Sequence, residues 1–136
     1  MTLQEQFLRD EGLRLRLYQD TAGKWSIGVG RNLSDVGISR AEALFLLQND
    51  IQAATQSLET FLPWTAALDD GRLSALVAMT FNMGIWGLCE FKLFLAAVQA
   101  GDWSEARDQI LQSKWAEEVG ARAQRLAIQI ETGVIQ

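Results

Sequence analysis

Residues 13–33 are the one stretch of this 136-residue chain with a strand pattern, and a helical pattern covers most of the rest. Leucine and arginine alternate over residues 13–18, residues 19–23 have turn composition, and Trp25, Ile27 and Val29 then alternate with small residues. This pattern predicts a β-hairpin, with a third short strand near residues 31–33. One small sheet among many helices places the chain in the α+β class, mostly α.

Two capping boxes mark the helices on either side of the hairpin. The first is Thr2-x-x-Glu5, which predicts a short helix that reaches about residue 11 and ends at Gly12 as its C-cap. The second is Ser39-x-x-Glu42, which opens a long helix. Apolar residues at helical spacing along that helix should face inward. They are Leu44, Leu47, Ile51, Ala54 and Leu58.

The remainder of the chain should form short amphipathic helices. Breaks are predicted at Pro63, residues 69–71, residues 84–87, residues 101–102, Ser113 and Gly120. The chain has no internal repeat and no linker rich in Pro, Gly or Ser. We therefore expect a single domain over residues 1–136. Its lobes would be a hairpin lobe at about 12–38 and a helical lobe from 1–11 and 59–136, with a connecting helix at 39–58.

Two residue types limit the chemistry. Cys89 is the single cysteine, so it cannot close a disulfide within the chain and should be a buried free thiol. Histidine is absent, which removes Ser-His and Cys-His nucleophiles, the usual zinc ligand and imidazole base catalysis. An enzyme with this sequence would have to work through carboxylates.

Net charge and hydropathy argue against nucleic acid and a lipid bilayer as partners of the chain. The net charge of −5 argues against nucleic acid, because Lys and Arg supply most of the affinity for phosphates. No apolar run approaches the ~20 residues of a membrane-spanning helix, so we expect no membrane span. The N-terminus lacks the basic and apolar regions of a signal peptide, which predicts synthesis and folding in the cytoplasm, with any export relying on another route.

Glu11 and Asp20 bracket the first predicted strand. A carboxylate in the last turn of a helix faces the negative end of the helix dipole, which costs roughly 0.3–1 kcal/mol at an exposed site. Taken alone, Glu11 is a solvated or Arg-paired charge, Asp20 is a residue that hydrogen-bonds its own turn, and Ser26 is a solvated strand position. Taken together, two acids brought close by a helix end and a hairpin suit glycosidic cleavage, in which one carboxyl donates a proton and the other orients water.

A dense pattern of fixed residues runs through this region: Glu11-Gly12-x-Arg14-Leu15-x-x-Tyr18-x-Asp20-x-x-Gly23-x-x-Ser26-Ile27-Gly28-x-Gly30. It resembles the signature of the phage-type lysozymes, glycoside hydrolase family 24. Matches further along are Phe81-Asn82-Met83-Gly84, Ser113-Lys114-Trp115, Arg122-Ala123-x-Arg125 and Thr132-Gly133. The resemblance covers essentially the whole chain.

The resemblance implies a lysozyme-like fold and an endolysin-like muramidase. Its substrate would be the β-1,4 bond between N-acetylmuramic acid and N-acetylglucosamine in bacterial peptidoglycan, cleaved by a monomer with no metal and no cofactor. By the same likeness Glu11 is the general acid, Asp20 positions or activates water, and Ser26 is its hydroxyl partner, with inversion at the anomeric carbon. Arg122 matches an arginine that pairs with the catalytic glutamate.

For glycan contact the resemblance points to Phe81, with Asn32 and Gln109 at matching positions by spacing. Asn32 replaces a usual leucine and Gln109 a usual asparagine. Ser26 stands in place of threonine and loses the methyl group that restricts its rotamer. Arg31 stands in place of histidine and can act only as a permanently charged partner that bridges the lobes.

The five tryptophans are expected in the core and not as the main sugar platform. They are Trp25, Trp64, Trp86, Trp103 and Trp115.

Two other functions stay open on the sequence. A lytic transglycosylase needs the Glu11 acid but forms an anhydro product without water, so it does not require Asp20. A catalytically weak glycan-binding module, for instance within a tail or secretion apparatus, would need neither. An active muramidase would reach the cell wall after membrane permeabilisation, by a holin for example, or as cargo of another system.

Overall fold

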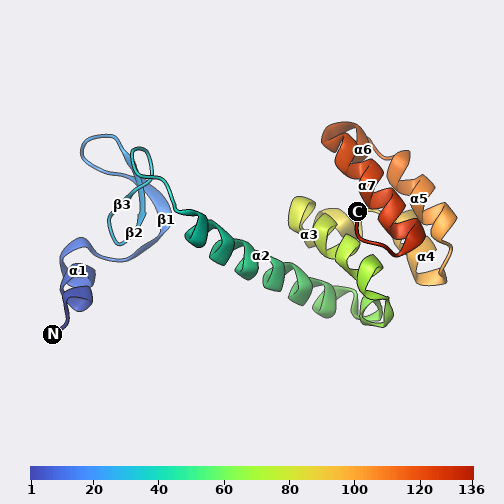
Figure 1. Ribbon diagram of the computed structural model, residues 1–136, viewed down its shortest axis with the longest axis horizontal. Coiled ribbons are helices and arrows are strands. Elements are labelled where there is room, and N and C mark those ends of the chain that lie inside the picture. Colours follow the sequence, from blue (N-terminus) through green and yellow to red (C-terminus); the bar gives the residue numbers. More distant parts are fainter. The chain divides into compact units, whose positions relative to one another are not determined.

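The computed structural model describes residues 1–136, which divide into two compact units, residues 1–46 and 47–136. Figure 1 labels the elements of both units. The N-terminal unit holds α1 (Leu3–Glu11), β1 (Arg14–Gln19), β2 (Trp25–Gly28), β3 (Arg31–Asn32) and the first turns of α2 (Arg40–Phe61). The C-terminal unit holds the rest of α2, the 3-10 helix η1 (Pro63–Ala67), α3 (Asp70–Cys89), α4 (Lys92–Ala100), α5 (Trp103–Leu111), α6 (Lys114–Val119) and α7 (Ala121–Thr132).

The predicted fold class is confirmed: the protein is mostly helical, with one antiparallel sheet of strand order β1-β2-β3. The pairing of β1 with β2 is irregular. Arg14 pairs with Gly28 and Tyr18 pairs with Ser26, so four steps along β1 match two steps along β2. Such a bulge bends the strand and is often found beside functional sites.

Both predicted capping boxes are confirmed. The Thr2 hydroxyl accepts from the backbone N–H of Glu5 at 3.1 Å, and the Glu5 carboxylate accepts from the backbone N–H of Thr2 at 2.6 Å. Ser39 and Glu42 make the same reciprocal pair at the start of α2. Gly12 caps α1 with a φ of 75°, which a residue with a side chain rarely adopts.

The hydrophobic core lies in the C-terminal unit, where α3, α4, α5 and α7 pack together. Its largest fully buried apolar side chains are Leu58, Leu76, Met79, Leu88, Phe94, Val98, Ile110 and Ile130. In the N-terminal unit Ser26 is the one buried residue.

The start of α3 is fastened to the end of α7. Arg72 donates from Nε to the carbonyl of Ile130 at 2.6 Å and from Nη2 to the carbonyl of Glu131 at 2.7 Å. The Gln129 side chain donates to the carbonyl of Gly71 at 2.8 Å. The two bonds from Arg72 satisfy carbonyls in the last turn of α7 that would otherwise lack partners.

Three burial predictions are wrong in whole or in part. Along α2 Ala54 and Leu58 are buried, but the other three members of the predicted stripe are exposed, namely Leu44, Leu47 and Ile51. Of the tryptophans, Trp115 is buried, Trp64 and Trp103 pack partly against the core, and Trp25 and Trp86 are exposed. Cys89 is a free thiol as expected, but it is partly exposed and not buried. Helical spacing identifies a candidate face, and the amount of partner surface decides how much of it is covered.

Helix α3 is the one helix long and apolar enough to cross a membrane by length and composition. It contains non-helical backbone at Gly84, where φ is 78° and ψ is 162°, so it consists of two helices joined by a kink. Each piece is shorter than the ~20 residues that a span requires. Its residues Leu76 and Met79 form part of the core, which is the other common reason for such a composition.

Arg31 joins the sheet to the start of α2 within the N-terminal unit. Its guanidinium donates to the Glu42 carboxylate at 2.9 Å and to the Gly37 carbonyl at 3.2 Å. The hydrogen bond from Arg31, helped by those from Ser39, lowers the pKa of Glu42 to about 2. Glu42 thereby serves both the capping box and the ion pair.

We expect Glu42→Gln to destabilise the protein at neutral pH and not in acid. The folded state has the lower pKa, so the stabilisation is present above the unfolded pKa near 4.5 and is lost as the pH falls toward about 2. Thermal unfolding followed at several pH values measures the effect. The gap in melting temperature between wild type and variant should close across that interval, whereas Glu59→Gln, which alters an exposed carboxylate without an ion pair, should open no gap.

Candidate active site

Glu11 is the last residue of α1 and is exposed. Its carboxylate makes no hydrogen bond and no ion pair within the N-terminal unit. It lies over the turn between β2 and β3, because a Cβ added at Gly30 would be 3.1 Å from Glu11 Oε2. Gly30 also has a φ of 68°, so this position favours glycine for its backbone and for the space it leaves. The Glu11 carboxylate thus lies beside the sheet without a hydrogen-bond or ion-pair partner.

Asp20 lies in the turn between β1 and β2 and holds that turn together. Its Oδ1 accepts from the backbone N–H groups of Ala22 and Lys24, both at 2.9 Å. Its Oδ2 has no hydrogen-bond partner in the protein. The structural interpretation of Asp20 as a turn residue is therefore correct for one oxygen, while the other oxygen is available to a substrate or water.

Ser26 and Asn32 are paired across β2 and β3. Ser26 is 3% exposed. Its hydroxyl makes no hydrogen bond within the protein. No fully buried polar atom lacks a partner, so this hydroxyl oxygen must still be in contact with solvent. The Asn32 side chain is engaged with Asp35, donating to its carboxylate at 2.9 Å and accepting from its backbone N–H at 3.1 Å. Asn32 is thus committed to a loop, which weakens its assignment as a glycan contact.

Phe81 and Arg122 come together in the C-terminal unit. Both line an apolar groove of about 530 Å³ between α2, α3 and α7, together with Leu47, Ile51 and Val77. Arg122 is exposed and makes no ion pair within its unit. A pairing of Arg122 with Glu11 would be a contact between the two units, and it stays a prediction.

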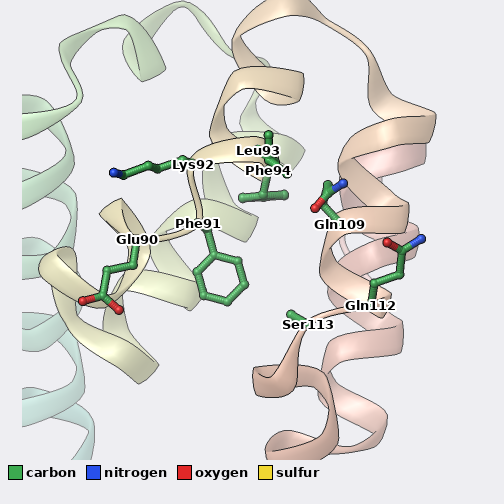
Figure 2. A pocket seen from close by; sticks show the side chains of 8 residues that line it. All are labelled: Glu90, Phe91, Lys92, Leu93, Phe94, Gln109, Gln112 and Ser113. Atoms are coloured by element: carbon green, nitrogen blue, oxygen red, sulfur yellow. The ribbon is translucent and has the colours of Figure 1, made fainter.

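Gln109 lies at a different pocket of the C-terminal unit, with a volume of about 490 Å³. Figure 2 shows Gln109 on α5, and Gln112 directly after that helix, facing the segment that carries Phe91. The Gln109 amide donates to Glu105 at 2.7 Å, which leaves its carbonyl oxygen available. Polar amides beside an aromatic ring are suited to sugar or peptide groups.

Two of the motifs that resemble the family contact each other. The Trp115 indole N–H donates to the Asn82 side chain at 2.8 Å, and Trp115 is 8% exposed. This bond fixes the segment that carries Phe81 to the start of α6. Sequence spacing places both motifs without indicating that they touch, because 33 residues separate them.

A small antiparallel sheet followed by a mostly helical remainder is the arrangement expected of a lysozyme-like protein. The family model described as phage lysozyme matches residues 9–129. The chain belongs to the phage lysozyme family.

Three relatives illustrate the range of the similarity. The chain is 29% identical to the probable T4-type lysozyme 1 of Dictyostelium discoideum over 93% of its own length and 91% of the relative's. It is 33% identical to the endolysin of Acyrthosiphon pisum secondary endosymbiont phage 1, over 79% of its own length and 72% of the relative's. It is 29% identical along its whole length to the pre-baseplate central spike protein Gp5 of Enterobacteria phage T4, but it spans only 28% of that protein.

Proposed function

We propose that this protein is a muramidase that hydrolyses the β-1,4 bond between N-acetylmuramic acid and N-acetylglucosamine in bacterial peptidoglycan. Glu11 is the general acid, and Asp20 with Ser26 positions the attacking water. The observation that carries the proposal is the uncommitted Glu11 carboxylate against Gly30, in a chain of the phage lysozyme family. The proposed place of action is the cell wall, after release from the host cytoplasm.

The proposed reaction needs no group beyond these side chains. Glu11 gives its proton to the glycosidic oxygen as the bond from that oxygen to the anomeric carbon breaks. Water forms a new bond to the anomeric carbon from the opposite face, and its proton passes to Asp20. Oδ2 of Asp20 suits this role because Oδ1 is anchored to the turn. The expected product has inverted configuration.

Asp20→Asn is expected to lower hydrolysis of purified peptidoglycan about 100-fold or more, since a positioned acid or base contributes on that scale. Asn retains an acceptor oxygen for the two turn N–H groups, so the hairpin should survive. Turbidity clearing measures the rate, and circular dichroism checks the fold. Mass spectrometry of the wild-type digest tests the alternative: anhydromuramic ends, with full activity retained in Asp20→Asn, would identify a lytic transglycosylase.

A second candidate is a catalytically weak wall-binding module within a tail apparatus. The observation that favours it is the similarity along the whole chain to the phage T4 spike protein. In that case the intact chain would clear a wall suspension no faster than its Glu11→Gln variant.

A further inference from the structure

Phe61 and Trp86 form an exposed aromatic pair on the C-terminal unit. Their ring centroids are 4.6 Å apart and the ring planes are inclined by 59°. Trp86 is 65% exposed and Phe61 is 47% exposed. Large aromatic side chains are usually well covered, so an indole that is held in place by a neighbouring ring yet open to solvent indicates a binding surface.

The pair is close along α2 and α3 to the lining of a groove, although neither ring belongs to that lining. A hollow of about 310 Å³ lies between α2 and α3 in the C-terminal unit, and its lining includes Ser57, Phe81 and Ile85. Phe61 is one helical turn beyond Ser57 on α2, and Trp86 directly follows Ile85. The groove is lined by Phe81, a proposed glycan contact, and by residues within one helical turn of the aromatic pair.

The lining of this groove favours a neutral, polyhydroxylated ligand. Its remaining residues are Asp50, Ala53, Ala54, Thr80 and Gly84. Small side chains leave room for a ring, Asp50 and Ser57 supply hydrogen-bonding oxygens, and Asp50 is the one charge. The net charge of −5 disfavours an anionic lipid surface as the partner.

We propose that Phe61 and Trp86 form a stacking platform for an N-acetylhexosamine ring, which extends glycan binding beyond Phe81. The apolar C–H face of the sugar ring would lie on the indole, and its hydroxyl groups would reach the groove. This inference rests on the proposed function for the identity of the glycan. The pair acts in binding and touches no reacting atom, so its loss raises KM for peptidoglycan and leaves kcat unchanged.

Trp86→Ala is expected to weaken binding of the tetramer of N-acetylglucosamine about three- to tenfold, the scale of one aromatic contact. Isothermal titration of the full chain measures the affinity. Phe61→Ala should weaken binding to a smaller extent, and Trp86→Tyr should retain most of it. Ile128→Ala removes from α7 an apolar side chain that is as exposed as Phe61 and does not line the groove, and it should have no effect.

Equal affinities of Trp86→Ala and Ile128→Ala, or no binding of the tetramer by the wild type, would overturn the platform. So would a wild-type dimer, or wild-type binding to phosphatidylcholine vesicles, that the Trp86→Ala substitution abolishes. Wild-type clearing of peptidoglycan tests the proposed function separately. If wild type hydrolyses the wall and Trp86→Ala has an unchanged KM, the platform alone fails; if wild type binds the tetramer through Trp86 without hydrolysis, the muramidase assignment alone fails.

Discussion

Glu11→Gln is expected to reduce the rate of peptidoglycan clearing by about 10²–10⁴-fold, which is the usual contribution of a positioned general acid. The substitution removes the transferable proton and changes little else, because the Glu11 carboxylate has no partner within its unit and lies against Gly30. Glutamine is also better placed than glutamate at the negative end of the α1 dipole. Stability should therefore be unchanged or slightly raised while activity is lost.

Asp10→Asn is the matched control for this experiment. Asp10 precedes Glu11 in the last turn of α1 and is an exposed carboxylate whose ion pair is with the neighbouring Arg9. Its replacement alters the charge of the same helix end by the same amount, so it should keep close to full activity. A Glu11→Gln protein that clears the wall as fast as Asp10→Asn would refute the assignment of Glu11 as the acid.

Gly71→Ala is expected to cost about 3 kcal/mol or more in the free energy of unfolding, at the upper end of the range for overpacking. Gly71 is buried at the first turn of α3, and an added Cβ would collide with the backbone carbonyl oxygen of Gly133. Relief would require α3 and the end of α7 to separate. That movement would also strain the bonds from Arg72 to the carbonyls of Ile130 and Glu131.

Guanidinium denaturation of Gly71→Ala and Gly87→Ala compares a backbone obstacle with a side-chain obstacle. Gly87 lies in the second part of α3, after the kink at Gly84, and its added Cβ would be 3.2 Å from the side chain of Met83. Alanine also favours the helix by about 1 kcal/mol over glycine. Gly87→Ala should therefore be close to neutral. Similar losses in the two variants would show that the Gly71–Gly133 contact is not the source of the effect.

Local sequence signals predicted where the helices begin and end. The two capping boxes, the Gly12 cap and the helix break near Gly84 are each determined by a few adjacent residues, so no knowledge of distant partners is needed. The hairpin was predictable for the same reason. Placement of Glu11 at the end of α1 and of Asp20 in the turn followed from these elements.

The strand register and the contacts between residues far apart in the chain could not be predicted from the sequence. The irregular pairing of β1 with β2 depends on which partner residues meet, and alternation of Leu and Arg gives no warning of it. The exposure of Trp86 and Leu47 reflects how much surface packs on α2 and α3, which helical spacing does not contain. The hydrogen bonds of Asn32 to Asp35 appear only in the structure, whereas the turn-holding role of Asp20 was already expected from the sequence.

The two oxygens of Asp20 have different roles, one in the turn and one free of hydrogen bonds, and this restricts which sequences the hairpin tip can accept. One oxygen builds the bend that carries it, so the orientation of the other is set by the backbone of residues 20–24 and needs no separate supporting side chain. A library that randomises this tip would lose the proposed catalytic carboxylate and the turn that supports it in one step. Grafting the pentapeptide onto another hairpin should, conversely, transfer a carboxylate that is already aimed.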